Sequence, residues 1–555
     1  MPVNSMSQYT AAKGELREIL GDRYVSDDPA IIASYSWVTA NGNIMSTKQL
    51  YDTRPVAVTL PSTTEEVQAI VKVCRRHGLM FQASSTGHSS FATVHYNNVI
   101  GIDLRRMNHM EIDADNQMAI IEPYVTCQTL QAEAMRVGLT THIVGAGWTH
   151  SPLASATSVW GIGISGNHTG TNQRNLLGWE LVTPEGEIVR VGSCGSGDGW
   201  FAGEGPGPGL RGMLRGSAGA LSGLGVFTRI GYKLHPWNGP PELEHKGPHP
   251  QIGVGLTDTM RFYHPVWKNW EGVTKAAYDL LKSSASTFIV RMPPDSIALT
   301  LTRTNQEFIE MVEADLLPPI AREENNHSWT LLTVSETPAE AQWRERVIHS
   351  IVDSTGGRML DVDSEHVEVM SRNILTSCYI PRVYRLSPRT TLSSYGVYES
   401  FSHIPEIIPK TKKMMAPYKG KYKALEKGSE EEFWIWSNEG RQVWAENIIA
   451  CDSDTGKSLA DGLAFLLETI DDNQENPRGV EAFAVGPSVD LYHRNHNADQ
   501  WMYKVKKTFD PEDMADGYYP NTKRTLVGAM WPLFTKIFKI FPLLRRLILR
   551  IGFVK

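Results

Sequence analysis

Three separate loops of the sequence are rich in glycine and serine, and loops of this kind are suited to holding phosphate groups. They cover residues 84–90, 161–170 and 214–225, and each lies next to a predicted strand. Small residues bring backbone N–H groups close to a ligand, and a pyrophosphate needs such donors. Any one of these loops could be a simple turn, but three of them within about 140 residues favour a shared ligand.

None of the three loops has the arrangement of a common nucleotide motif. No GxGxxG lies between a first strand and its helix, and the sequence contains no GxxxxGK[ST]. We therefore disfavour a Rossmann dinucleotide site and a P-loop.

A second group of polar residues, Tyr492-His493-Arg494-Asn495-His496, is a candidate catalytic cluster. Tyrosine or histidine can act as a base, and arginine can bind an oxyanion because its charge is fixed and its donors are rigid. The alternative is a surface loop with ordinary hydrogen bonds. No acidic partner follows the two histidines at a clear metal-ligand spacing, so we predict no metal site. The predicted catalytic residues are Tyr492, His493, Arg494 and His496.

The elements that must position these loops alternate between strands and helices. A hydroxyl cap at residues 62–64, glutamates in the first turn and Gly78 at the end delimit one amphipathic helix. A second helix is predicted over 126–137, and a turn with proline and glycine at 183–186 predicts a hairpin. The predicted strands are 55–61, 98–104, 118–123, 177–182, 187–191 and 226–234.

The length and composition of the chain indicate at least two globular domains. A chain of 555 residues is too long for one core, and 41% hydrophobic and 21% charged residues are ordinary values for a folded protein. The segment Trp237-Asn238-Gly239-Pro240-Pro241 predicts a boundary, and the chain from there to about residue 487 has the pattern of one α+β domain. A net charge of −7 gives no sign of a nucleic-acid partner.

The cysteines and the N-terminus indicate where the chain works. The sequence has five scattered cysteines without a CxxC pair, which argues against a disulfide framework, a zinc site or an iron–sulfur cluster. We expect isolated buried thiols. Residues 1–9 are polar and lack the apolar region of a secretory signal, so we expect a cytoplasmic location or the cytoplasmic face of a membrane.

Several of these segments together resemble the FAD-binding domain of the vanillyl-alcohol oxidase and p-cresol methylhydroxylase superfamily. That superfamily also includes berberine-bridge-type enzymes, glycolate-oxidase-type D-2-hydroxy acid dehydrogenases and alkyl-dihydroxyacetone-phosphate synthase. The resemblance runs in order over roughly residues 15 to 524. The matching segments are 54–88, 101–108, 121–126, 161–167, 180–187, 215–225, 508–511 and 519–521.

The resemblance implies an α+β fold with two domains. A two-subdomain FAD-binding domain of the p-cresol methylhydroxylase (PCMH) type would cover residues 15–236, and a return segment would cover 500–524. A substrate cap domain with an antiparallel sheet would cover 237–499, with the isoalloxazine ring between the domains. The residues expected to bind FAD are Ser84, Ser85, Thr86, Gly87, His88, Ser89, Gly161, Gly163, Ser165, Gly166, Asn167, Thr169, Gly219, Gly225, Val226 and Asn521.

His88 matches the histidine that is bonded to the flavin 8α-methyl group in berberine-bridge-type members. A covalent bond here would raise the flavin potential and prevent loss of the cofactor. The alternative is a histidine beside the flavin without a bond. Thr86 stands in place of the first glycine of that loop, and no cysteine for a second attachment lies near Gly161.

The cluster at 492–496 resembles the Tyr-Arg-x-His segment that binds a phenolate oxygen in vanillyl-alcohol oxidase, with Arg494 and His496 in register. The resemblance implies an FAD-dependent oxidoreductase that removes a hydride from an alcohol or para-alkyl phenol and passes electrons to an unidentified acceptor. A D-2-hydroxy acid dehydrogenase feeding a respiratory chain is a second hypothesis, weakened because the metal-binding segment of those enzymes is not found. A flavin-bearing electron-transfer subunit of a larger complex is a third.

The C-terminal tail, residues 525–555, lies beyond the resemblance. Residues 529–555 contain six cationic residues and no acidic one, and four of the cations fall on one face of a helix. The charges and Pro542 leave no run of ~20 apolar residues, so a helix lying on a membrane surface is favoured over one that spans it. The alternative is docking on a partner subunit or on a second copy of the chain.

Overall fold

The computed structural model describes most of the chain from residue 5 to residue 517. The described residues are 5–35, 54–87, 94, 96, 98–145, 147–158, 161–192, 223–248, 251–377, 390–398, 400–418, 433–438, 442–451, 465, 468–469, 472, 476, 479–480 and 498–517.

The first part of the chain forms a four-stranded sheet in the order β1-β2-β4-β3, covered by α1 (Ser5–Leu20) and α4 (Thr64–His77). Strands β2 and β3 both run parallel to β4. Thr63 caps α4 by accepting a hydrogen bond from Glu66 N, and Gly78 ends it with φ of 65°. The predicted helix and strands of this part are confirmed. The strands are β1 (Val25–Ser26), β2 (Ala57–Thr59), β3 (Met80–Ser84) and β4 (Val99–Asp103).

A second, antiparallel sheet follows in the order β5-β6-β10-β8-β9. The predicted hairpin is present, because Gly186 N donates to Thr183 O over 2.8 Å and Gly186 has φ of 82°. The predicted second helix is also present as α5 (Cys127–Arg136). The strands are β5 (Met110–Asp113), β6 (Met118–Ile121), β8 (Leu176–Val182), β9 (Ile188–Val191) and β10 (Val226–Lys233), and the short pair β7 (Leu139–Thr140) and β11 (His235–Pro236) lies beside them.

Residues from 260 to 480 build a seven-stranded sheet in the order β14-β17-β16-β20-β21-β19-β22. All of its pairs are antiparallel, as expected for the cap. The strands are β14 (Met260–Tyr263), β16 (Phe288–Arg291), β17 (Thr330–Val334), β19 (Thr390–Tyr398), β20 (Trp434–Asn438), β21 (Gln442–Cys451) and β22 (Gly479–Val480), with the small pairs β12 (His245–Lys246) with β13 (Gly253–Val254) and β15 (Pro265–Val266) with β18 (Arg358–Met359).

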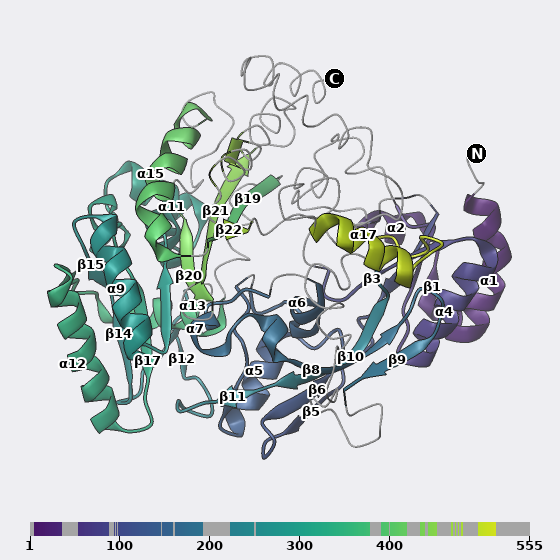
Figure 1. Ribbon diagram of the computed structural model, residues 1–555, viewed down its shortest axis with the longest axis horizontal. Coiled ribbons are helices and arrows are strands. Elements are labelled where there is room, and N and C mark those ends of the chain that lie inside the picture. The colour runs from purple at the N-terminus through teal and green to yellow at the C-terminus, as the bar shows by residue number, and fades with distance from the viewer. Residues whose placement is uncertain are drawn as a thin grey trace.

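Both faces of the sheet are buried at β16, β17 and β20, and successive side chains of each strand point to opposite faces. Ile289 of β16 packs under one layer of helices, whereas its neighbours Phe288 and Val290 face the other layer. The outer layer is α9 (Trp270–Ser283), α12 (Pro338–Ser354) and α15 (Ile404–Met415), seen at the left of Figure 1. The inner layer is α10 (Pro294–Leu301), α11 (Asn305–Glu313) and α13 (Ser364–Thr376).

The inner face of the cap sheet shares its core with the first part of the chain. Ile143 and Ile164 belong to the same apolar cluster as Trp436 and Leu375 of the cap. Two helices of the first part, α6 (Pro152–Ser158) and α7 (Gly166–Thr169), lie near this contact, with α7 beside β20 (Figure 1). The two parts therefore meet through a continuous apolar interface.

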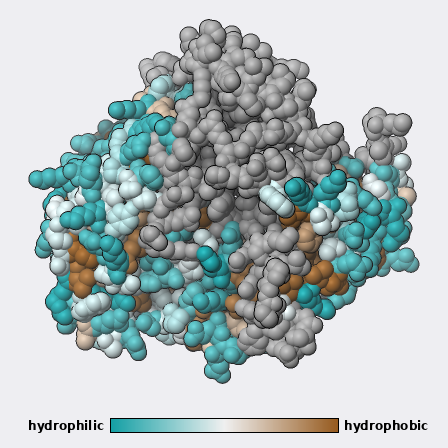
Figure 2. All heavy atoms as spheres, in the orientation of Figure 1, coloured by the Kyte–Doolittle hydropathy of each residue, from teal (hydrophilic) through white to brown (hydrophobic). Residues whose placement is uncertain are grey.

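The surface seen in Figure 2 is mainly hydrophilic where the chain is described, with apolar side chains scattered among polar ones. The large exposed apolar residues, such as Leu316 and Trp501, come from separate elements. Within the described ranges, no helix is both long and apolar enough to cross a membrane. The predicted tail 525–555 lies outside those ranges.

Candidate functional site

The first predicted loop begins at the carboxyl end of β3. Ser84 ends the strand, where its carbonyl oxygen accepts a hydrogen bond from Leu104 N over 2.9 Å. Ser85 and Thr86 are half-buried, and Gly87 is exposed with φ of 67°. Ligands of parallel sheets bind beyond the carboxyl ends of the strands, so this position suits a cofactor loop. His88 and Ser89 lie outside the described residues.

The second predicted loop is held against the segment 142–145 by backbone contacts. Gly145 N donates to Ile162 O and Ile164 N donates to Ile143 O, each over 2.9 Å. Gly163 lies at the centre of this contact, where an added Cβ would overlap Ile143 O. Gly161 has φ of 64°, and its added Cβ would lie 2.6 Å from Asn172. Both positions therefore require glycine.

Buried hydroxyl groups fix the loop after Gly163. Ser165 Oγ accepts a hydrogen bond from Ile143 N over 2.8 Å and lies 3.1 Å from Thr169 Oγ1. Thr169 Oγ1 in turn lies 2.7 Å from Nδ1 of His142. Burial lowers the pKa of His142 to about 3, so this imidazole is neutral at ordinary pH. His142 was not predicted from the sequence, because no motif surrounds it.

Only the end of the third predicted loop is described. Gly225 has φ of 140°, and an added Cβ would overlap Val182 O. Val226 begins β10 immediately afterwards. Gly219 and the rest of the loop to residue 222 lie outside the described residues, as does Asn521.

The buried side chain of Lys506 connects this third loop to the end of the described chain. Lys506 is on α17 (Ala498–Phe509), and its Nζ donates to Gly223 O over 2.9 Å and to Ala515 O over 3.1 Å. Its charge is balanced by Asp510 at 2.5 Å, one turn later on the chain. Ala515 forms a parallel bridge with Phe81 of β3. One ammonium group thus links the segments that lead to the first and third loops, which the sequence did not predict.

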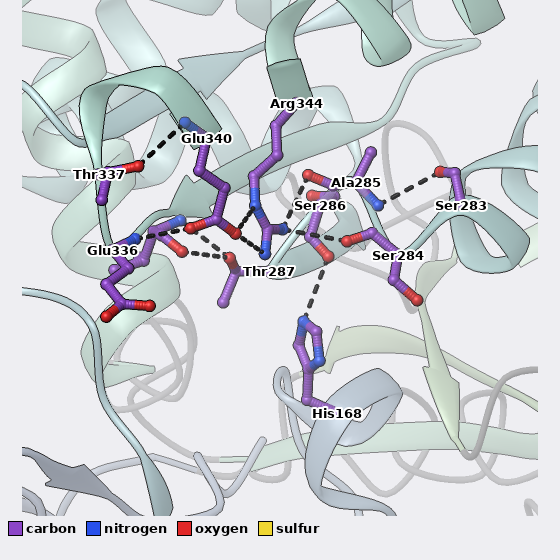
Figure 3. Close-up of polar contacts among 11 residues, drawn as sticks. His168, Ser283, Ser284, Ala285, Ser286, Thr287, Glu336, Thr337, Glu340 and Arg344 are labelled. Atoms are coloured by element: carbon purple, nitrogen blue, oxygen red, sulfur yellow. Dashed lines mark hydrogen bonds and ion pairs between the residues drawn. The ribbon is translucent and has the colours of Figure 1, made fainter. Parts of the chain in front are cut away.

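Polar contacts join the second loop to the cap, as Figure 3 shows. Asn167 Nδ2 donates to Thr287 O over 3.1 Å, and His168 Nε2 lies 3.2 Å from Ser286 O. These carbonyl groups precede β16, and Arg344 of α12 fixes the same turn by donating to Ser284 O and Ala285 O. Arg344 is held by Glu340 in an ion pair of 2.8 Å (Figure 3).

The residues at this contact fit a large polar cofactor. Oδ1 of Asn167 and Oδ1 of Asn438 are both buried, and neither has a hydrogen-bond partner among the described residues. Gly166 lies directly against β20, where an added Cβ would be 2.8 Å from Asn438 Oδ1. Unsatisfied buried amide oxygens beside small-residue loops are suited to a ligand that carries N–H donors and phosphates, as FAD does.

The predicted catalytic cluster lies outside the described residues. Tyr492, His493, Arg494 and His496 all fall in the range 481–497, which the structure does not describe. Their role remains a prediction from the sequence. In the described ranges, no group of three or more histidine, cysteine, aspartate or glutamate side chains is arranged to hold a metal ion.

Comparison with known sequences identifies the first part of the chain. Residues 55–192 match a family described as an FAD binding domain. A 4-cresol dehydrogenase [hydroxylating] flavoprotein subunit of Pseudomonas putida is 27% identical over 243 residues, which is 42% of this chain and 44% of the relative. A D-lactate dehydrogenase of Archaeoglobus fulgidus is 29% identical over 187 residues, which is 32% of this chain and 38% of the relative. These matches span less than half of each curated relative.

An FAD-linked oxidoreductase of Mycobacterium tuberculosis, of uncharacterized activity, is 30% identical over 185 residues, or 33% of this chain and 38% of the relative. Among solved structures, p-cresol methylhydroxylase with bound substrate has a TM-score of 0.71 at 16% identity and covers 93% of this chain and 96% of its own. The 4-ethylphenol oxidase of Gulosibacter chungangensis also has a TM-score of 0.71, at 18% identity, and the match covers 93% of this chain and 98% of that one. The chain is therefore a flavoprotein whose residues 55–192 form an FAD-binding domain, within the two-domain α+β fold of p-cresol methylhydroxylase.

Proposed function

We propose that the chain is an FAD-dependent oxidoreductase that removes a hydride from an alcohol or a para-alkyl phenol. The observation that carries this proposal is the FAD-binding domain at residues 55–192 joined through an extensive contact to a cap. The relative from Pseudomonas putida, a 4-cresol dehydrogenase flavoprotein subunit, supports the substrate class. Bound FAD would accept the hydride, and the protein would position the substrate and move the proton.

The predicted loops supply the cofactor contacts in this proposal. The phosphates and the flavin would be held by residues 84–89, 161–169 and 219–226, together with Asn521 from the return segment. Tyr492, His493 and His496 would take the proton of the substrate hydroxyl group, and Arg494 would stabilise the oxyanion. The domain limits that go with this assignment are 15–236 and 500–524 for FAD and 237–499 for the substrate cap.

Two further functions have a specific observation in their favour. The relative from Archaeoglobus fulgidus is a D-lactate dehydrogenase, which favours a D-2-hydroxy acid as substrate. The Pseudomonas putida relative is named as a flavoprotein subunit, which favours an electron-transfer component of a larger complex. Screening alcohols, 4-alkylphenols and D-2-hydroxy acids with an artificial electron acceptor separates the three. A subunit would show no turnover alone and would recover turnover with its partner.

The tail 525–555 belongs to the same proposal as a membrane-surface anchor. Its cationic face would contact anionic headgroups, and its phenylalanines and Trp531 would lie in the interface. The enzyme would then act at the cytoplasmic face of a membrane.

The first prediction concerns the cofactor and its attachment. Purified protein should be yellow, with one FAD per chain, and the visible spectrum should be recorded before and after acid precipitation. A bond through His88 would leave the yellow colour in the pellet, and His88→Ala would release it to the supernatant. A protein that binds no FAD even after reconstitution would overturn the proposed function. Colour in the wild-type supernatant would leave FAD in place and reject only the covalent bond.

The second prediction concerns the second cofactor loop. Gly163→Ala should lower stability by about 1–3 kcal/mol and release FAD, because the new methyl group overlaps Ile143 O. The matched control is Gly14→Ala on the exposed face of α1, where nothing lies within 4 Å and stability should rise by about 0.5–1 kcal/mol. Thermal unfolding and bound FAD are measured for both. Full FAD occupancy in Gly163→Ala would remove this loop from the site.

The third prediction concerns substrate chemistry. If Arg494 stabilises an oxyanion, Arg494→Ala should lower kcat/KM on the order of 10²–10³-fold with the active substrate from the screen. Its FAD content and thermal unfolding should match those of the wild type. An unchanged kcat/KM would return the cluster at 492–496 to an ordinary surface loop.

The fourth prediction concerns the tail. Deleting residues 529–555 should leave the flavin spectrum unchanged and move the protein from the membrane fraction to the soluble fraction. Full-length protein should sediment with vesicles of anionic lipid at low salt and be released at high salt. If the full-length protein ignores such vesicles, docking on a protein partner takes the place of the membrane.

A further inference from the structure

A buried arginine of the cap lies at the contact with the FAD-binding side of the molecule. Arg372 is on α13 and is 6% exposed. Its guanidinium lies 4.9 Å from the centre of a ring of Trp148, which belongs to the opposite part of the chain. Trp148 follows the segment 142–145, whose backbone pairs directly with the second cofactor loop. The segment 142–145 and Trp148 therefore lie between Arg372 and that loop in space.

The position of Arg372 is fixed by contacts on both sides of the interface. Ser377 Oγ, just after α13, donates to Gly145 O over 2.8 Å. Gln131 of α5 donates through Nε2 to Leu375 O over 2.8 Å. These bonds hold the last turn of α13 against the FAD-binding side, one turn beyond Arg372. They fix the backbone from which the Arg372 side chain extends toward Trp148.

Arg372 has no counter-charge among the described residues. Its Nε is buried without a hydrogen-bond partner, and no described carboxylate or carbonyl group accepts from its guanidinium. Glu368, one turn earlier on the same helix, pairs with Lys246 at 3.2 Å instead. The pKa of His245 is lowered first by partial burial and then by the charge of Arg372, which places that charge near His245.

Another buried arginine of the cap, Arg291, also lies over a tryptophan ring, that of Trp270 at 5.0 Å, but it has carbonyl acceptors as well. Arg291 is 0% exposed and donates to the carbonyl oxygens of Phe433 and Asn326 over 2.5 and 3.2 Å. Its burial is offset by these bonds. Arg372 has only the face of Trp148, and a cation–π contact compensates less desolvation than hydrogen-bonded acceptors do.

We propose that Arg372 binds an oxyanion of the substrate, a carboxylate or a phosphate, at the contact between the cap and the second cofactor loop. The guanidinium lies against the ring of Trp148, and the N–H groups of an arginine can bind two oxygens of one anion at once. This inference rests on the proposed function and narrows its substrate class. The alcohol that is oxidised carries a negative group at another position, as a hydroxy acid or a phosphorylated alcohol does.

The test is a binding titration on FAD-loaded protein that needs no turnover. Phenylacetate and phenyl phosphate are the oxyanion probes, and phenylacetamide is the neutral match for phenylacetate. Binding is followed by the visible difference spectrum of the flavin and by tryptophan fluorescence. Wild-type protein should bind one or both oxyanions more tightly than the amide, and the preferred probe identifies carboxylate or phosphate.

Variants locate that preference on Arg372. Arg372→Gln should weaken binding of the oxyanion probe ~10- to ~100-fold and leave binding of the amide unchanged, because a charged hydrogen-bonded contact is lost. Arg372→Lys keeps the charge but not the planar guanidinium, so its oxyanion affinity should lie between those of the wild type and Arg372→Gln. Lys246→Gln is the control: it removes a nearby cation that already has a carboxylate partner, and its binding should stay within about twofold of the wild type.

Three results would overturn the inference. The first is a wild-type protein that binds the oxyanions no more tightly than the amide. The second is a Lys246→Gln variant that loses as much oxyanion affinity as Arg372→Gln. The third is an Arg372→Gln variant that loses FAD but keeps its oxyanion affinity, which would assign the arginine to the cofactor. Should Arg372→Gln fail to fold, the wild-type preference and Arg372→Lys still decide. If the protein binds the oxyanion but oxidises no alcohol, the proposed function is rejected and the oxyanion site at Arg372 is kept. The proposed function and the oxyanion site can therefore fail independently.

Discussion

The backbone contact between Gly163 and the segment 142–145 is the constraint on which both the cofactor loop and the domain interface depend. Two hydrogen bonds of 2.9 Å bring the strands so close that no side chain fits at Gly163. The far side of the same segment faces the cap, where an added Cβ on Gly145 would lie 3.0 Å from Trp436 and where Ser377 donates to Gly145 O. A shift of this segment would disturb the predicted FAD loop and the cap together.

Features set by neighbours in sequence could be predicted, and those set across the fold could not. The ends of α4 follow from Thr63 and Gly78, and the hairpin follows from the turn at Gly186, because caps and turns are local. Strand β3 was missed because it has five residues and gains its place from pairing with β4 and from the bridge to Ala515, more than 400 residues later. The three loops could be picked out as candidates because their glycine content is itself local.

The same distinction explains which site residues escaped the sequence. His142 and Arg372 are single residues of common type, and their importance lies in what folds onto them: Thr169 in one case and Trp148 in the other. Lys506 has a local trace, since Asp510 lies one turn away on the chain. An i, i+4 pair of opposite charge is normally a solvated surface feature, so only the fold reveals that this one is buried at 0% and 1% exposure.

Among the described residues, three cations are buried: Lys506, Arg291 and Arg372. They differ in how their desolvation is offset, and the difference bears on the proposed site. Lys506 pairs with a carboxylate and Arg291 donates to two carbonyl groups, whereas no described carboxylate or carbonyl group accepts from the guanidinium of Arg372. The contact between the cap and the second cofactor loop is held instead by an apolar cluster and by neutral hydrogen bonds such as that of Asn167 with Thr287. Since none of these contacts uses the charge of Arg372, the anion proposed to bind there would not compete with the contacts that hold the cap. Binding energy is then not spent on reorganising the interface, which is the condition for a preorganised site.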